Sequence, residues 1–286
     1  MKFVRFQKDN KVCLGLQKGE FICDLAPVLM SMGAKPASEL ENLIAQNLDL
    51  SLLAQKAEKE KFDLPVEKVE FLPPIANPSK ILCLALNYRD HIEENNLQQP
   101  QKPYVFLKAP TSLTGHMQPI YNPQGCESLA FEAELAVVIG KGGKGIPREK
   151  AFEHIFGYTI MNDMSARDLG KTNLPTIVVD WYCTKSFDSS GPLGPCVVTK
   201  DEIANPNNLH IQLTVDGAVK QDGNTSLMLY QVPELVEFVS RNNTLKPGDI
   251  IATGTLGGAA AKDRVAIGGV IKITVEGIGT LQNTVV

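Results

Sequence analysis

The chain has 286 residues, of which 43% are hydrophobic and 21% charged, and its formal net charge is −4. These values are typical of a globular protein with one large and one small domain, and the charge gives no reason to expect nucleic acid or an anionic membrane as a partner. No apolar run approaches the roughly 18–20 residues that a membrane-spanning helix needs, so we expect no membrane association.

The cysteine pattern and the first residues favour a reduced, cytoplasmic protein. The sequence MKFVRFQKDNKVCLGL contains no long apolar core and no small-residue cleavage site, so it does not resemble a signal peptide. Six cysteines are scattered without a CxxC pair, and most lie in or beside apolar segments. Such cysteines usually behave as small hydrophobic residues rather than as disulfide partners.

Residues 1–72 are expected to form a small α/β domain. Three short strand candidates cover 2–7, 11–17 and 20–25, and apolar residues at roughly helical spacing follow over about 38–59. The segment FLPPIANPSK at 71–80 is rich in proline and marks a plausible domain boundary. A second, larger domain is therefore expected over residues 73–286.

The larger domain is expected to consist mostly of strands. Strand candidates cover 80–86, 103–109, 134–140, 156–163, 195–199, 210–217, 249–254 and 270–281, whereas helix candidates cover only 147–154 and 232–242. Strands that seldom alternate with helices argue against a doubly wound parallel sheet. The sequence predicts an α+β fold that is predominantly β, such as a roll or sandwich with a few helices.

Two glutamates stand two positions apart in the apolar run FEAELAVVIG. Positions i and i+2 of a strand project from the same face, so Glu132 and Glu134 would point the same way. In a poorly solvated place the two carboxylates would repel each other unless a divalent cation lay between them. A half-buried strand with both glutamates in water is the simpler alternative, and ExE alone does not decide between the two.

The segment ALNYRDHIEENN places a histidine and a carboxylate on one helix face. Asn87 or Asp90 could cap the start of this helix, and His91 and Glu94 would then lie one turn apart. A histidine oriented by a carboxylate is a common general base. A solvated surface helix is the alternative.

Two further charged residues stand beside apolar segments. Asp163 follows the strand-like run FGYTIMN and would add a third carboxylate, although an aspartate in a turn or cap is also common. Lys185 lies among Trp181, Cys183 and Phe187, where its ammonium group could hold a carboxylate or a developing enolate. Alternatively its stem covers the core and the amine stays in water.

Taken in order, these segments resemble the fumarylacetoacetate hydrolase superfamily, in particular its acylpyruvate hydrolase, isomerase and decarboxylase branch. The blocks that carry the resemblance are KFVRF, GLQKGEFICDLAPVL, KILCLALNYRDHIEE, PYVFLKAPTSLTG, FEAELAVVIGKGGKGI, FGYTIMNDMSARD, TKSFDSSGPLGP, TLKPGDIIATGT and EGIGTLQNTV. They cover nearly the whole chain. The resemblance implies a mixed β-roll as the larger domain, and commonly a homodimer.

The resemblance also implies roles for particular residues. The family's metal ligands correspond to Glu132, Glu134 and Asp163, which would bind Mg²⁺ or Mn²⁺, with Ca²⁺ also possible. The water-activating pair corresponds to His91 and Glu94.

The remaining implied positions contact the substrate. Lys185 corresponds to the lysine that contacts substrate oxygens. Lys108 lies in a block near the pocket, Thr255 matches a threonine that lines the site, and Arg89 is a candidate for binding the substrate carboxylate.

The activity implied by the resemblance is metal-dependent hydrolysis of a C–C bond in an acylpyruvate or fumarylpyruvate-like 1,3-diketo acid, in the catabolism of aromatic compounds. A metal-dependent decarboxylase or isomerase of oxaloacetate or of a 2-hydroxy-dienedioate is the alternative within the family. A catalytically weak metal-binding structural dimer is the alternative from another class. Retention of both His91 and Glu94 favours hydrolysis, because decarboxylation needs no activated water.

The sequence departs from the family pattern at several places near the expected pocket. Gly170 stands where many members carry a glutamine, and residues 171–181 look atypical. Leu256 replaces the usual proline after GT, and residues 257–269 end differently from the family's usual turn. These changes leave the expected fold and metal site in place, and they bear on substrate identity.

Overall fold

A large mixed sheet connects the N-terminal part of the chain with its centre. In this computed structural model, which describes residues 1–174, 177–259 and 264–286, twelve strands form the sheet. Their order is β4-β3-β2-β1-β16-β12-β11-β19-β6-β7, with β5 paired to β1 and β8 to β16. The strands are β1 Lys2–Lys8, β2 Lys11–Lys18, β3 Phe21–Asp24, β4 Leu64–Pro65, β5 Glu70–Leu72, β6 Ile81–Ala85, β7 Tyr104–Lys108, β8 Leu113–Thr114, β11 Ala133–Ile139, β12 Ile155–Asn162, β16 Gly191–Thr199 and β19 Ile250–Ala252.

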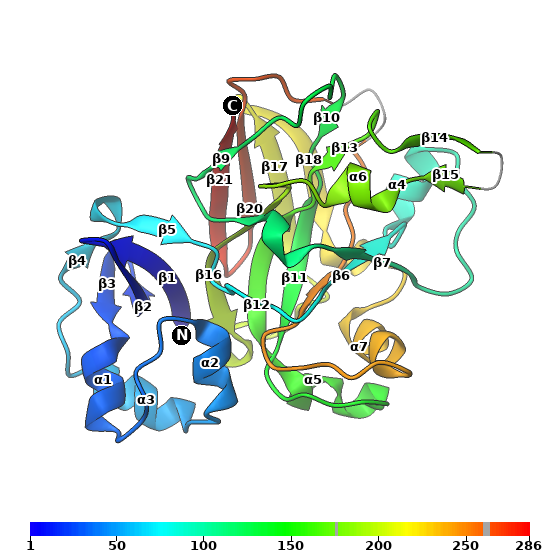
Figure 1. The fold of residues 1–286 in the computed structure, drawn as a ribbon. Helices are drawn as coiled ribbons and strands as arrows, with labels where there is room; N and C mark the ends of the chain where they lie inside the picture. The colour runs from blue at the N-terminus through cyan, green and yellow to red at the C-terminus, as the bar shows by residue number, and fades with distance from the viewer. Residues whose placement is uncertain (175–176, 260–263) are drawn as a thin grey trace.

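A second, five-stranded sheet contacts the middle of the large one (Figure 1). Its order is β18-β17-β20-β21-β9, with β9 Pro119–Ile120, β17 His210–Val215, β18 Ala218–Asn224, β20 Val270–Val275 and β21 Gly279–Val285. Two short pairs complete the strands, β10 Leu129–Ala130 with β13 Ser165–Ala166 and β14 Lys171–Leu174 with β15 Ile177–Val179. The apolar strands β11 and β12 are buried along their whole length, because the second sheet covers one face of the large sheet.

The described helices are short, with four to nine residues each. They are α1 Leu25–Ser31, α2 Leu40–Ala45, α3 Leu50–Ala57, α4 Arg89–Glu94, α5 Ala151–His154, α6 Trp181–Lys185 and α7 Val232–Ser240. The architecture confirms the α+β, mostly β fold expected from the sequence. None of the described helices is long and apolar enough to cross a membrane.

One expected helical stretch is interrupted. The pattern over residues 38–59 gives two helices, α2 and α3, because Asn47 takes a left-handed conformation with φ of 48°. Asp49 then starts α3 by accepting hydrogen bonds from the Ser51 and Leu52 amides at 2.8 and 3.1 Å. Apolar periodicity predicts which face of such a segment is buried, but it does not reveal a break as short as one helical turn.

The N-terminal lobe, seen beside the larger β-rich body in Figure 1, is joined to it through the large sheet. Strand β1 pairs with β16, with Lys2 opposite Val198. The buried residues Val4 and Phe6 belong to the same hydrophobic cluster as Leu135 in the body. The expected division at residue 72 stays a prediction.

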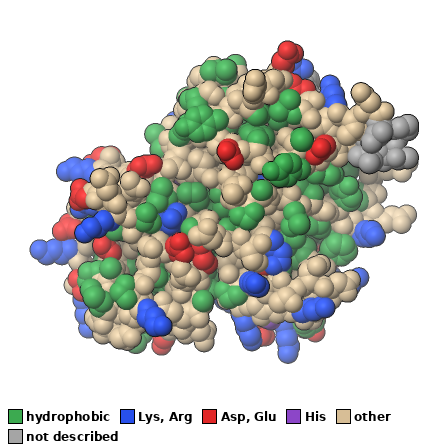
Figure 2. Space-filling model, viewed as in Figure 1, with side chains coloured by type: hydrophobic (Ala, Val, Ile, Leu, Met, Phe, Trp, Pro, Cys, Tyr) green, Lys and Arg blue, Asp and Glu red, His purple; other side chains and the backbone are tan. Residues whose placement is uncertain are grey.

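Surface charge follows the pattern expected from the composition. On the face shown in Figure 2, acidic and basic side chains are interspersed among apolar and neutral ones. This face therefore presents no extended patch of one sign, as nucleic-acid binding would require.

A partly buried histidine near the second sheet makes stability sensitive to acid. His116 Nδ1 accepts the Gln282 amide at 3.1 Å, and burial lowers the pKa of His116 to about 4. The folded state favours neutral His116, so the stabilisation from this residue is complete above the unfolded-state pKa of about 6.5 and is lost as the pH falls towards 4. We expect protonation of His116 alone to lower the free energy of unfolding by roughly 1–2 kcal/mol as the pH falls from 7 to 5. Urea unfolding at the two pH values checks this: the loss should be smaller in His116→Gln, and an equal loss in both proteins would contradict it.

Candidate metal centre and active site

Three carboxylates meet where β11 begins and β12 ends. Glu132 precedes β11, Glu134 lies on it, and Asp163 follows β12. The two strands are antiparallel with Ala133 opposite Asn162, so the end of one strand adjoins the start of the other. One oxygen from each carboxylate lies within 4.8 Å of the others. The structure therefore brings together the three residues that the sequence predicted as metal ligands.

Backbone contacts hold the carboxylates in this arrangement. The Asp163 amide donates to the Glu132 carbonyl at 2.9 Å, and the Glu132 amide donates to Asn162 Oδ1 at 3.0 Å. The Gly254 amide donates to Glu134 Oε2 at 2.8 Å. Hydrogen bonds thus fix the main chain at Glu132 and Asp163 and one oxygen of the Glu134 carboxylate.

The charge balance of the group fits a divalent cation. Burial, followed by the negative charges of Asp163 and Glu132, raises the pKa of Glu134 well above its usual value. Burial would also raise the pKa of Asp163, but the ammonium groups of Lys108 and Lys185 hold it below the usual value. Mg²⁺, Mn²⁺ and Ca²⁺ prefer carboxylate oxygens, and a cation would relieve the repulsion at Glu134. These residues therefore could hold a divalent metal.

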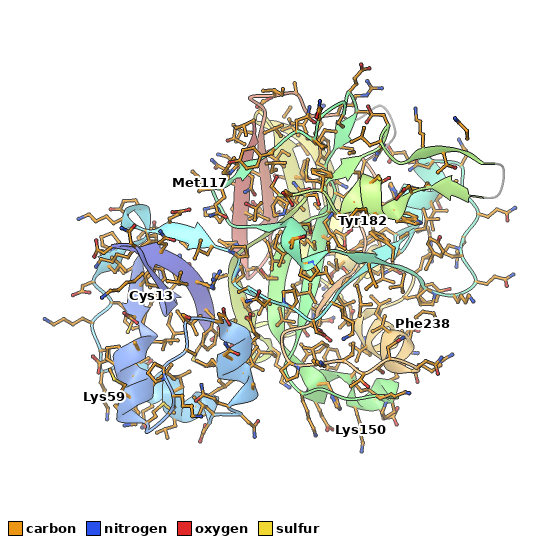
Figure 3. The ribbon with its side chains drawn as sticks, viewed as in Figure 1. Cys13, Lys59, Met117, Lys150, Tyr182 and Phe238 are labelled. Atoms are coloured by element: carbon orange, nitrogen blue, oxygen red, sulfur yellow. The ribbon has the colours of Figure 1, made fainter. Side chains whose placement is uncertain are left out.

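Lys185 lies between two of the carboxylates. Its Nζ is 2.7 Å from Glu132 Oε2 and 2.7 Å from Asp163 Oδ2. Burial would lower its pKa, but the two carboxylates raise it, so the ammonium group stays charged. It comes from α6, the helix on which Figure 3 labels Tyr182. Lys185 is buried, whereas Tyr182 is 72% exposed. Since a fixed positive charge stabilises an oxyanion, Lys185 is suited to the substrate role that the sequence predicted.

Lys108 is buried behind the group, at the end of β7. Its Nζ donates to Asp163 Oδ1 at 2.8 Å, to the Met164 carbonyl at 3.5 Å and to the Lys185 carbonyl. An ammonium group has three protons, and these contacts engage them all. Lys108 thus holds the Asp163 carboxylate and the main chain at Lys185 in place. Direct contact between Lys108 and a substrate stays a prediction.

Replacing Lys108 by methionine should strongly destabilise the protein. The change leaves a buried Asp163 with Lys185 as its remaining cationic partner among the described contacts. Removing one member of a buried ion pair typically costs about 3–5 kcal/mol. Urea unfolding of Lys108→Met measures the loss, with the exposed Lys102→Met as the matched control. Equal unfolding free energies for both variants would contradict the role given to Lys108.

Helix α4 carries His91 but does not begin as the sequence predicted. Its N-cap is Tyr88 and no side chain caps it, so the capping by Asn87 or Asp90 is wrong. Instead Asn87 binds the backbone of Thr253 and Tyr230, because the strand end before α4 packs against these segments. Asp90 Oδ2 accepts the Gly257 amide at 3.0 Å.

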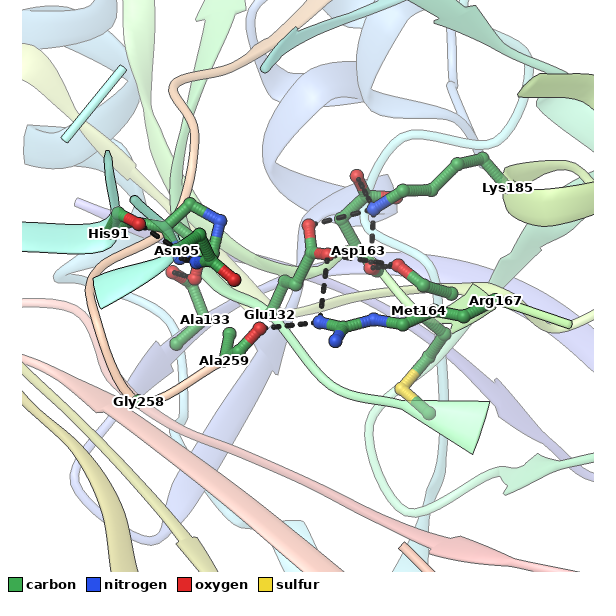
Figure 4. Close-up of polar contacts among 12 residues, drawn as sticks. His91, Asn95, Glu132, Ala133, Asp163, Met164, Arg167, Lys185, Gly258 and Ala259 are labelled. Atoms are coloured by element: carbon green, nitrogen blue, oxygen red, sulfur yellow. Dashed lines mark hydrogen bonds and ion pairs between the residues drawn. The ribbon is translucent and has the colours of Figure 1, made fainter. Parts of the chain in front are cut away.

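His91 and Glu94, which the sequence predicted as a pair, contact different partners. Glu94 Oε2 accepts a hydrogen bond from the Gly258 backbone amide at 2.8 Å, whereas the side-chain Nδ2 of Asn95 lies 3.4 Å from His91 Nδ1. Figure 4 shows His91 on one side of Glu132 and Lys185 on the other. Burial lowers the pKa of His91, although the nearby Glu132 and Glu94 act in the opposite direction. His91 is therefore mainly neutral at pH 7 and can accept a proton.

The two remaining predicted residues have different settings. Arg89 is exposed on α4. Thr255 is buried, and its Oγ1 donates to the Ala133 carbonyl at 3.0 Å and accepts from Gln221 at 2.9 Å. Thr255 thus supports the strand between the two glutamates, and contact with a substrate by either residue stays a prediction.

Arg167 was not among the site residues predicted from the sequence, although it lies in the segment FGYTIMNDMSARD. Its guanidinium group donates to the Ala259 carbonyl and lies 4.0 Å from Glu132 Oε1 (Figure 4). Ser165 Oγ also donates to Glu132 Oε1, at 2.9 Å. Arg167 follows Asp163 by four positions. A charged residue so close in sequence to a predicted ligand could have indicated a site residue, because the turn after β12 stays beside the carboxylates.

The structure shows the surroundings of Gly170 and Leu256, two residues at which the sequence departs from the family pattern. A Cβ at Gly170 would lie 1.6 Å from Thr184 Oγ1, so α6 occupies the space that a larger residue would need. Leu256 is fully buried and packs near Gly223. Within the atypical segments 171–181 and 257–269, residues 175–176 and 260–263 lie outside the described part of the chain.

Comparison with known proteins agrees with this geometry. A family model described as fumarylacetoacetate (FAA) hydrolase C-terminal matches residues 80–286. Among similar sequences, oxaloacetate tautomerase YisK of Bacillus subtilis is 37% identical, with 100% of each chain covered. The mitochondrial oxaloacetate tautomerase fahd2 of Xenopus laevis is 35% identical, covering 100% of this chain and 90% of its own.

Solved structures also match over the whole chain. A fumarylacetoacetate hydrolase from the psychrophilic Exiguobacterium antarcticum has a TM-score of 0.82 at 32% identity, covering 100% of this chain and 99% of its own. Maleylpyruvate hydrolase from Sphingobium sp. SYK-6, in complex with manganese(II) ion and pyruvate, has a TM-score of 0.82 at 28% identity with the same coverage. The family match, the full-length relatives and the arrangement of carboxylates agree, and the chain belongs to the fumarylacetoacetate hydrolase family.

Proposed function

We propose that this protein is a divalent-metal-dependent enzyme that forms enolates of small 2-oxo acids, and that its main reaction is keto–enol tautomerisation of oxaloacetate. The observation that carries the proposal is the buried group of Glu132, Glu134 and Asp163 with the Lys185 ammonium held among them. Full-length relatives named oxaloacetate tautomerase support the choice of substrate.

The metal ligands in this proposal are Glu132, Glu134 and Asp163, and the ion is Mg²⁺ or Mn²⁺. The manganese found in the similar maleylpyruvate hydrolase supports this choice. When bound, such an ion supplies positive charge that polarises a carbonyl oxygen and makes the neighbouring carbon more acidic.

The side chains of the chain then carry out the proton transfers. Neutral His91 takes a proton from the carbon beside the 2-oxo group. The electrons of that C–H bond form the C=C bond of the enolate, and the π electrons of the carbonyl move to its oxygen. Lys185 stabilises the resulting negative charge, and His91 returns the proton to the oxygen to give the enol. Arg167, 22% exposed beside Glu132, is placed to bind a substrate carboxylate.

The position of Glu94 favours tautomerisation over hydrolysis. Hydrolysis needs a water molecule activated by a base, and a carboxylate that orients His91 would assist it. Here the Glu94 carboxylate accepts the Gly258 amide instead. Tautomerisation requires only the proton transfers that His91 can perform alone.

C–C hydrolysis of an acylpyruvate or fumarylpyruvate-like acid is the second candidate. It shares the enolate-stabilising site, it uses the His91 and Glu94 pair, and a maleylpyruvate hydrolase is among the similar structures. Decarboxylation of oxaloacetate would also proceed through an enolate. The homodimer and the cytoplasmic location expected from the sequence stay predictions.

The candidates differ in their products, so product analysis tests the proposal. The purified protein would be incubated with Mn²⁺ and oxaloacetate, acetylpyruvate or fumarylpyruvate, and the products followed by NMR. Faster keto–enol equilibration of oxaloacetate with its total amount unchanged supports tautomerisation. Pyruvate with carbon dioxide would indicate decarboxylation, and cleavage of an acylpyruvate into pyruvate and a free acid would replace the proposal with hydrolysis.

A further inference from the structure

We infer that Gln221 is a positioning residue that holds both the metal-binding carboxylates and helix α4, and so links cation binding to the placement of His91. The inference rests on the metal site of the proposed function. Gln221 lies on β18, in the sheet that carries none of the three carboxylates, and its side chain is 1% exposed.

The side-chain amide of Gln221 fixes the strand between the two glutamates. Its Oε1 accepts the Ala133 amide at 2.9 Å, and its Nε2 donates to Thr255 Oγ1 at 2.9 Å. Thr255 Oγ1 in turn donates to the Ala133 carbonyl at 3.0 Å. Strand β19 pairs with β11 only from Ala136 onwards, so these side chains replace a neighbouring strand at Ala133. Both main-chain groups of the residue between Glu132 and Glu134 therefore depend on them.

The other contacts of Gln221 hold the turn that follows. Nε2 also donates to the Leu256 carbonyl at 2.9 Å and approaches the Gly257 carbonyl at 3.4 Å. A Cβ at Gly258, where φ is +88°, would lie 2.0 Å from the Lys220 carbonyl oxygen. The turn formed by residues 254–259 thus packs closely against β18 beside Gln221.

The same turn binds the helix that carries His91. The Gly257 amide donates to Asp90 at 3.0 Å, and the Gly258 amide donates to Glu94 at 2.8 Å. At its other end, the Gly254 amide donates to Glu134 at 2.8 Å. A shift of the turn would therefore move the metal ligand Glu134 and helix α4 together. Among the described side chains, Gln221 is the one whose amide bonds both to this turn and to the strand that carries the glutamates.

The test compares Gln221→Met with Gln212→Met in the full-length protein. Methionine has a similar length but neither donates nor accepts like an amide. Gln212, on the neighbouring β17, donates to the exposed Asp222 at 2.8 Å and has no other side-chain hydrogen bond among the described residues, so it is a matched control. We expect Gln221→Met to bind Mn²⁺ about 10-fold more weakly, the effect of a lost buried hydrogen bond, and Gln212→Met to bind it unchanged.

Hydrogen exchange provides a readout that a purely structural role would not change. Mn²⁺ should slow amide exchange in the segments 89–94 and 254–259 of the unaltered protein, and this effect should disappear in Gln221→Met. If Gln221→Met does not fold, Thr255→Val, which removes the hydroxyl between Gln221 and Ala133, should show the same changes to a smaller extent.

The outcomes separate this inference from the proposed function. Lower thermal stability with unchanged Mn²⁺ affinity in Gln221→Met, or in Thr255→Val where that variant carries the test, would overturn the positioning role while leaving the metal site intact. Failure of the unaltered protein to bind Mn²⁺ would contradict the metal site and with it this inference.

Discussion

Glu134→Gln is expected to abolish high-affinity Mn²⁺ binding and to lower kcat about 10³-fold, the effect of removing one main electrostatic group from an active site. Glutamine keeps the shape of glutamate and can still accept the Gly254 amide, but it lacks the negative charge that a cation requires. The variant should be at least as stable as the unaltered protein without metal, because the pKa of Glu134 is raised by burial and by repulsion from Asp163 and Glu132. Calorimetric Mn²⁺ titration, steady-state kinetics and thermal unfolding with and without Mn²⁺ measure the three effects.

The matched control for this change is Glu127→Gln. Glu127 is exposed and precedes the ligands by five residues, so its removal should alter neither affinity nor turnover. Mn²⁺ affinity of Glu134→Gln equal to that of Glu127→Gln would contradict the assignment of the carboxylate group.

His91→Gln should lower kcat by about 10²–10⁴-fold while leaving Mn²⁺ affinity unchanged, because a general base contributes that much and His91 is not a metal ligand. Steady-state kinetics with oxaloacetate would measure the loss, and His210→Gln, at an exposed position on β17, is the control. Full activity of His91→Gln would show that another group takes the proton.

The pH profile gives a second readout of the same residue. Since burial lowers the pKa of His91 from its usual value of 6.5, the neutral form prevails at pH 7 and protonation begins only at lower pH. We expect kcat/KM to stay constant around neutrality, to fall below pH 6.5, and to lose this acid limb in His91→Gln. An acid limb that persists in the variant would assign the titration to another group.

The sequence predicted that the three carboxylates would lie together because their arrangement is local. Glu132 and Glu134 are two positions apart on one strand, and Asp163 ends the next strand in the chain, which pairs with the first. Alternation and antiparallel pairing therefore bring the three together with little information from the rest of the fold.

Contacts across distant segments could not be predicted in the same way. Lys108 reaches Asp163 across 55 positions, and Gln221 reaches Ala133 across 88 positions and two sheets. No periodicity encodes which polar side chain will replace a missing strand neighbour. The start of α4 was mispredicted for a related reason, since Asn87 is engaged by the distant Thr253 and Tyr230 rather than by its own helix.

The most direct test of the account is a metal add-back experiment on oxaloacetate. Protein treated with EDTA and then freed of the chelator would be titrated with Mn²⁺ while metal content and the rate of keto–enol equilibration are measured together. We expect activity to be absent at first and to rise in step with binding of one ion per chain. Undiminished activity in metal-free protein, or full Mn²⁺ occupancy without any acceleration, would contradict the proposed function.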